Sequence, residues 1–132
     1  MTVADNVEVS VSLRLTGTFD PDEVTASLGL VPTDQWRSGQ AGPAPRLRRP
    51  SDGWVRQLNK GFGEVAPHID QAARQLAKIS TQLQQVVALP GVSGYLGIAV
   101  DSPADHWPEI TLSAPTLALI AASGLSLDID VV

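Results

Sequence analysis

Residues 7–16 read Val-Glu-Val-Ser-Val-Ser-Leu-Arg-Leu-Thr, an alternation of apolar and polar side chains sustained over ten positions. Successive side chains of a β-strand point to opposite faces of its sheet, so the alternation predicts a strand with one buried and one solvated face. A second alternation, with apolar residues at 125, 127, 129 and 131, predicts a similar strand near the other end of the chain. Both strands would belong to a sheet that is covered by helices on one side only.

Three helices are expected between these strands. Asp20 can accept N–H bonds as the N-cap of the first, and Gly29 can end it in a left-handed conformation. The second helix is long, because apolar residues recur at steps of three and four from Ile69 to Val86. The expected bounds are residues 21–28 for the first helix, the segment between Gly63 and Pro90 for the second, and 114–123 for the third.

The remaining segments predict further strands and loops. Residues 34–53 are rich in Gly, Pro and Arg, have no periodicity, and indicate a long loop that is either functional or mobile. Short strands are expected at 53–58, 95–100 and 109–112, with a turn at 59–63 and a polar loop at 101–108. The whole chain, residues 1–132, is thus expected to form one α+β domain: a two-layer α/β sandwich with four to five strands in a mixed or antiparallel sheet and three helices on one face.

Composition limits the classes of function. The chain of 132 residues has no cysteine, a formal net charge of −5 and no apolar run of the length that spans a bilayer. Because affinity for phosphate backbones depends on cationic side chains, the acidic charge argues against nucleic-acid binding. We expect a cytoplasmic protein that binds neither nucleic acid nor membrane.

The charge is distributed unevenly. The segment 31–60 carries six basic and two acidic residues, a net charge of +4, whereas the rest of the chain carries three basic and twelve acidic residues, a net charge of −9. Arginine offers planar paired donors to carboxylates and phosphates, and tryptophan offers a stacking face. This pattern predicts a site for an acidic protein or a small anionic ligand, formed by Trp36, Arg37, Arg46, Arg48, Arg49 and Trp54.

The order of signals resembles a known family. It comprises the alternating strand at 9–16, the segment Asp-Pro-Asp-Glu-Val-Thr at 20–25, Leu-Gly-Leu-Val-Pro-Thr at 28–33, Gly53-Trp54, a long helix and the ending Leu-Ser-Leu-Asp-Ile-Asp at 125–130. Together these features resemble the bacterial domain-of-unknown-function family 4279 over nearly the whole chain. The resemblance implies a fold, but neither a substrate nor catalytic residues.

Two other functions are considered beside the binding module. A small hydrolase-type enzyme would use His68 or His106 with nearby carboxylates, and a structural homodimer would associate through its sheet. Asp101, Asp105, His106 and Glu109 offer oxygen and imidazole ligands, but their spacing matches no known metal loop. Asp128 and Asp130 share one strand face, as polar alternation alone would place them. The sequence therefore predicts no metal, no cofactor and no catalytic residue, and favours the binding module.

Overall fold

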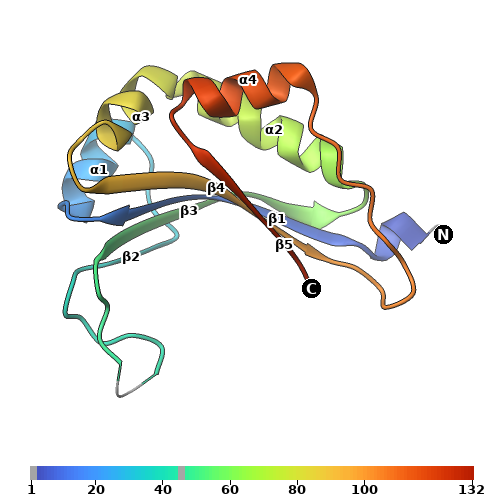
Figure 1. Ribbon diagram of the computed structural model, residues 1–132, viewed down its shortest axis with the longest axis horizontal. Helices are drawn as coiled ribbons and strands as arrows, with labels where there is room; N and C mark the ends of the chain where they lie inside the picture. Colours follow the sequence, from blue (N-terminus) through green and yellow to red (C-terminus); the bar gives the residue numbers. More distant parts are fainter. Residues whose placement is uncertain (1–2, 45–46) are drawn as a thin grey trace.

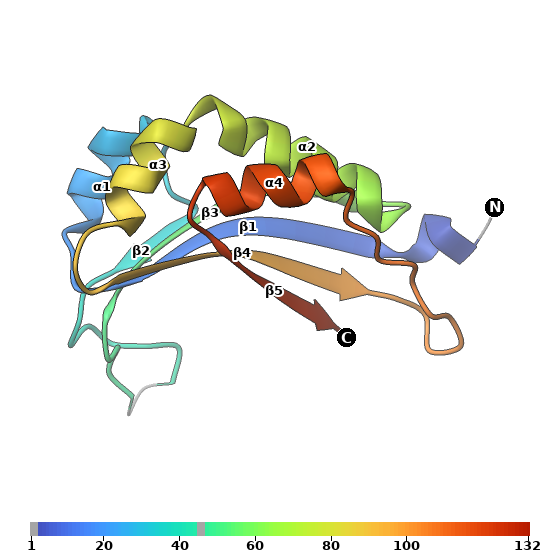
Figure 2. The same ribbon diagram turned by 45° about the horizontal axis from the view of Figure 1, so that its top comes forward.

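The computed structural model describes residues 3–44 and 47–132. Five strands form one sheet, and all four α-helices pack on the same side of it (Figures 1 and 2). In chain order the elements are η1 (Val3–Asn6), β1 (Glu8–Gly17), α1 (Pro21–Leu28), β2 (Asp34–Trp36), β3 (Asp52–Phe62), α2 (Val65–Lys78), α3 (Ser80–Val87), β4 (Val92–Asp101), α4 (Ala114–Ala122) and β5 (Ser126–Val131). The expected α+β fold is confirmed.

The sheet is mixed, with strand order β2-β3-β1-β4-β5. β1 is the central strand and pairs antiparallel with β3 and β4 over its whole length. β5 pairs parallel to β4, because the chain crosses over the sheet through α4 before β5 begins. A β-bulge in β3 opposite Val11 and Ser12 shifts the register by one residue, which places Asn59 on the helix side, where it bonds to His68 of α2.

The core lies between the sheet and the helices. The five apolar residues of the opening alternation, Val7 to Leu15, are all buried, as is Trp54 opposite Leu15 on β3. Burying one such aliphatic side chain stabilises the fold by roughly 1.5–3 kcal/mol relative to its exposure. The helices contribute the rest of the core, mainly through Ile69, Leu76, Leu83, Val86 and Ile120.

Four helices are present rather than three, because the long helix expected before Pro90 breaks at Ile79. Ile79 has φ −121° and ψ 17°, outside the helical range, and Ser80 and Thr81 after it have weak helix propensity. The break turns α3 away from the axis of α2 (Figure 2). Leu83 of α3 is thereby fully buried together with Leu76 of α2.

Two of the expected strand boundaries were wrong. Residues 109–112 form no strand; they run as extended coil, and Ile110 and Leu112 pack against the core without pairing. β3 continues to Phe62 through the segment where a turn was expected, because β1 opposite it is equally long. The segment 34–53 also differs from the expected loop at both of its ends, where β2 forms and β3 begins.

The last strand departs from the expected burial pattern. Leu127, Ile129 and Val131 do point to the helix side, but they are 37%, 39% and 45% exposed. α4 ends at Ala122 and leaves this margin of the sheet uncovered (Figure 2). Within the described ranges, no helix is both long and apolar enough to cross a membrane.

The two faces of β1 should differ sharply in their contribution to stability. Replacing Leu13, which is fully buried, by alanine should lower the free energy of unfolding by about 2–5 kcal/mol through lost burial and the cavity that remains. Replacing its neighbour Ser12, on the open face, by alanine should change the free energy of unfolding by about 0.5 kcal/mol or less. Urea unfolding of both variants measures the difference, and equal losses would contradict the assignment of faces.

Candidate functional site

The chain between β2 and β3 forms a projection, and its described residues, 37–44 and 47–51, are here called the tongue. Its two sides pair antiparallel at Ala41 and Arg48, and the amide of Arg49 donates to the carbonyl of Gln40 at 2.8 Å. The amide of Gly39 donates to the carbonyl of Arg49, also at 2.8 Å. Both ribbon views show the tongue extending from the sheet on the side opposite the helices (Figures 1 and 2). It therefore borders the open face of the sheet.

One carboxylate fixes the base of the tongue. Asp52 accepts hydrogen bonds from the amide of Ser38 at 2.8 Å and from the amide of Phe19 at 2.9 Å. These two backbone donors hold the pKa of Asp52 below its ordinary value. A charged carboxylate thus links the tongue to the segment before α1.

Arg37 is held in place by the N-terminus of α1. Its guanidinium donates to Asp20 at 2.8 Å and to Asp22 at 3.1 Å. The amide of Asp22 and then Arg37 lower the pKa of Asp20, which also caps the helix. Arg37 therefore serves the fold and is already neutralised.

Trp36 lies flat on the sheet. A Cβ atom built on Gly53, its partner on β3, would overlap the Trp36 ring, so glycine is required there for the ring to lie on the backbone. The guanidinium carbon of Arg49 lies over the same ring, 4.0 Å from its centroid. We call Gly53, the Trp36 indole and the Arg49 guanidinium the stack, in which the contact with the ring restrains the arginine.

Strand register brings further side chains to this stack. Asp34, Val55, Arg14 and Tyr95 lie in one row across β2, β3, β1 and β4, all on the open face. Neighbours in such a row have Cβ atoms about 4.5–5.5 Å apart. These residues, with the stack, line a hollow of about 400 Å³.

The two arginines of the hollow are unpaired. Within the described part of the chain, the side chains of Arg14 and Arg49 make no hydrogen bond or ion pair, and the Nε atom of Arg49 is buried without an acceptor. Asp34 is the acidic residue of the lining, so the hollow carries a net positive charge. We call this hollow, with Arg14 and Arg49 at its walls, the arginine hollow.

The structure brings together only part of the predicted site. Trp36 and Arg49 meet, whereas Arg37 is bound to α1 and Arg48 is exposed on the tongue. Trp54 is fully buried, and its indole N–H donates to Thr25 Oγ1 at 3.0 Å, so it belongs to the core. Arg46 lies outside the described residues.

Sequence reasoning missed Arg14 and Tyr95 as site residues. Arg14 had been placed on the open face by alternation, but nothing in the sequence shows which β4 residue lies beside it. The pairing of β1 with β4 supplies that neighbour. A basic residue on a strand face that otherwise carries Glu, Ser and Thr was the available signal.

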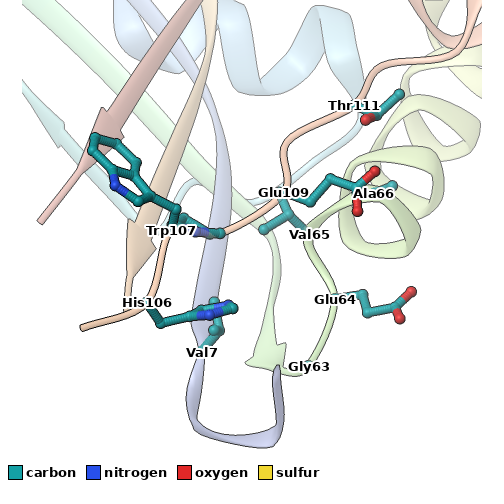
Figure 3. A pocket seen from close by; sticks show the side chains of 10 residues that line it. Val7, Gly63, Glu64, Val65, Ala66, His106, Trp107, Glu109 and Thr111 are labelled. Atoms are coloured by element: carbon teal, nitrogen blue, oxygen red, sulfur yellow. The ribbon is translucent and has the colours of Figure 1, made fainter. Parts of the chain in front are cut away.

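A second pocket lies at the opposite end of the sheet, where the 102–113 segment passes the start of α2. It has a volume of about 350 Å³, and Val7 and Val65 contribute apolar walls. Figure 3 shows the His106 ring next to Val7, with the carboxylates of Glu64 and Glu109 directed away from it. Among the hydrogen bonds of the described residues, none joins His106 to a carboxylate.

His68 is engaged in structural hydrogen bonds. Its Nε2 lies 3.2 Å from the carbonyl oxygen of Phe62, which can only accept, so Nε2 carries the proton. Nδ1 then accepts from the side-chain amide of Asn59 at 3.0 Å. Both nitrogens of the neutral ring are therefore occupied in joining α2 to β3.

The remaining carboxylates form no metal centre. Among residues 3–44 and 47–132, no group of three or more His, Cys, Asp or Glu side chains could hold a metal ion. Asp101 ends β4, and Asp105 is exposed in the loop that follows. Asp128 and Asp130 lie on the open face of β5 and form no ion pair with another described residue.

Gly53→Ala should break the aromatic stack. The new methyl group would overlap the indole, so Trp36 must leave the sheet and Arg49 must lose its support. We expect a changed near-ultraviolet circular dichroism signal and a shifted Trp36 indole N–H resonance. Gly42→Ala is the matched control, because a Cβ there meets only ordinary contacts in the same tongue; an equal effect of both changes would refute the stack.

The Asp52 anchor should make stability depend on pH. Its pKa is lower in the folded state than the ordinary 3.8, so its contribution is present above 3.8 and is lost as the pH falls through the folded-state value. Asp52→Asn should therefore be less stable than the wild type near neutral pH, and the two should converge below pH 3.8. Urea unfolding across this range measures the gap. Asp105→Asn, an equal charge change on an exposed loop, should show no such convergence.

Comparison with known proteins supplies a family. Searches of the curated proteins and of the solved structures found no match. The family model of DUF4279, described as a domain of unknown function, matches residues 7–132. This range covers β1 to β5 and all the residues of the arginine hollow, so the resemblance seen in the sequence is confirmed. The chain belongs to the DUF4279 family.

Proposed function

We propose that this protein is a binding module that captures a carboxylate or phosphate group in the arginine hollow. The observation that carries the proposal is that Arg14 and Arg49, from β1 and the tongue, line one hollow without a hydrogen-bond or ion-pair partner among the described residues. The proposal keeps the anionic ligand predicted from the sequence and moves the binding residues to Trp36, Arg49, Arg14 and Tyr95.

An anionic group would satisfy the polar atoms that the fold leaves unpaired. The guanidinium groups of Arg14 and Arg49 carry hydrogen-bond donors only, and they have no acceptor among the described residues. A carboxylate or phosphate accepts paired hydrogen bonds from such guanidinium groups. The ligand, rather than another part of the described chain, provides the missing acceptors.

The stack on Trp36 favours affinity by ordering the site beforehand. An arginine side chain loses rotamer freedom when it binds a ligand, and this loss weakens binding. Arg49 is already held 4.0 Å from the Trp36 centroid, and the Trp36 ring is held against Gly53. Less freedom therefore remains to be lost when the ligand arrives.

Asp34 limits which anionic ligands the hollow can accept. Its carboxylate lies in the same hollow and would repel a ligand carrying several negative charges. It can accept a hydrogen bond from a donor on the ligand. A ligand with one anionic group and one donor group fits this arrangement best.

Two sources can present such an anionic group. The volume of about 400 Å³ suits a small molecule and also admits an aspartate or glutamate side chain of a partner protein. The formal net charge of −5 disfavours nucleic acid as a third source. We also propose a cytoplasmic location, because the sequence has no cysteine for disulfide bonds.

The test is a binding series on three arginine variants. Arg14→Gln and Arg49→Gln should each weaken binding about tenfold or more, the size expected for a lost charge-assisted hydrogen bond. Arg74→Gln removes the same charge from the exposed side of α2, in the other layer, and should bind as the wild type does.

Isothermal titration with inorganic phosphate, with a small aromatic carboxylate and with a glutamate-containing peptide distinguishes the two sources. Binding of either small anion supports a small-molecule ligand, and binding of the peptide alone supports a protein partner. If none binds, or if Arg74→Gln weakens binding as much as the two hollow variants do, the proposal is wrong.

A further inference from the structure

The outer edge of β5 is a second unsatisfied surface of the sheet, and Arg14 of the arginine hollow also lines the shallow hollow on its open face. Among the described residues β5 pairs only with β4. The amide of Val132 donates to Val100, so alternate residues at 130, 128 and 126 face β4 in the same way. The N–H and C=O groups of Leu127, Ile129 and Val131 therefore point outward, where they have no strand to pair with.

The side chains along this edge are apolar on one face. Leu127, Ile129 and Val131 lie on the helix side, where a core is expected, but remain 37–45% exposed. α4, which directly precedes them, has no charged residue, and its Leu117 is 47% exposed. A helix without a polar face normally packs on both sides. The margin formed by α4 and β5 is therefore an incomplete core layer.

The other face of the same edge is acidic. Asp128 and Asp130 lie on the open face of β5 and make no ion pair within the described part of the chain. Their neighbours on β4, Gly97 and Ala99, are small and leave a shallow hollow beside the two carboxylates, whose far wall includes Arg14 of β1. There is space for a long side chain reaching in from beyond the edge.

These charges argue against a second copy of this chain as the occupant. In antiparallel pairing of β5 with itself about Ile129, each Asp128 would lie opposite an Asp130, and pairing about Asp128 would place that residue opposite itself. Like charges directly opposite each other destabilise a strand pair. Acidic residues at a sheet edge are a recognised protection against such self-association.

We propose that β5 is a docking edge for an extended segment of a partner protein in which basic and apolar residues alternate. The segment adds a sixth strand by main-chain hydrogen bonds to Leu127, Ile129 and Val131. Its apolar side chains complete the layer beside α4, and its lysine or arginine side chains meet Asp128 and Asp130.

The probe is an eight-residue peptide of alternating lysine and valine, compared with a peptide of the same composition in which the lysines are grouped. Only the alternating peptide should bind, and it should slow hydrogen exchange at the amides of Leu127, Ile129 and Val131. Asp128→Asn/Asp130→Asn should weaken binding at least about fivefold. The control Glu23→Gln/Asp105→Asn, with the same charge change at exposed sites, should not.

Peptides methylated at their backbone amide nitrogens test the main-chain pairing directly. In an added strand, either the lysine amides or the valine amides face β5, so methylation of one set should abolish binding and methylation of the other should not. Equal binding of both methylated peptides, or of the grouped peptide, would overturn the proposal by leaving only charge attraction. A dimer of the protein alone, detected by sedimentation and lost in an Ile129→Lys variant, would also overturn it, because the edge would then be occupied by a second copy.

Discussion

The pairing of β1 on both of its edges is the constraint on which the rest of the structure depends. This strand contacts β3 on one side and β4 on the other over ten residues, and every second side chain enters the core. A slip of one residue would move all five buried side chains into solvent. The same pairing that fixes the core also decides which polar side chains meet on the open face.

The candidate site follows from that register. Arg14 is flanked by Val55 and Tyr95 only because β1 pairs with both neighbouring strands. Trp36 arrives on the short strand β2, and its ring lies flat because its partner Gly53 has no side chain. The charged contacts of Asp52 and Arg37 then fix the tongue that carries Arg49. Basic residues scattered over the sequence thus serve different purposes, some holding the site and others lining it.

Sequence patterns predicted the features that are local. The alternation at 7–16 and the cap at Asp20 depend on neighbouring residues, and both were found where expected. β2 was missed because three residues form a strand only through pairing with β3. The break at Ile79 was missed because the apolar periodicity continues through it. Trp36 and Trp54 looked equivalent in the sequence, and only the pairing of Trp54 with Leu15 reveals that one of them belongs to the core.

The two margins of the sheet differ in how much strand edge they offer to a further strand. β2 offers only three residues and is continuous with the tongue, whereas β5 offers six residues and a free outer side. Because β2 pairs with only three residues of β3, the rest of that margin is formed by β3 itself. The two margins therefore present different strands to a partner, and a segment that fits β5 is not expected to fit the other margin equally well.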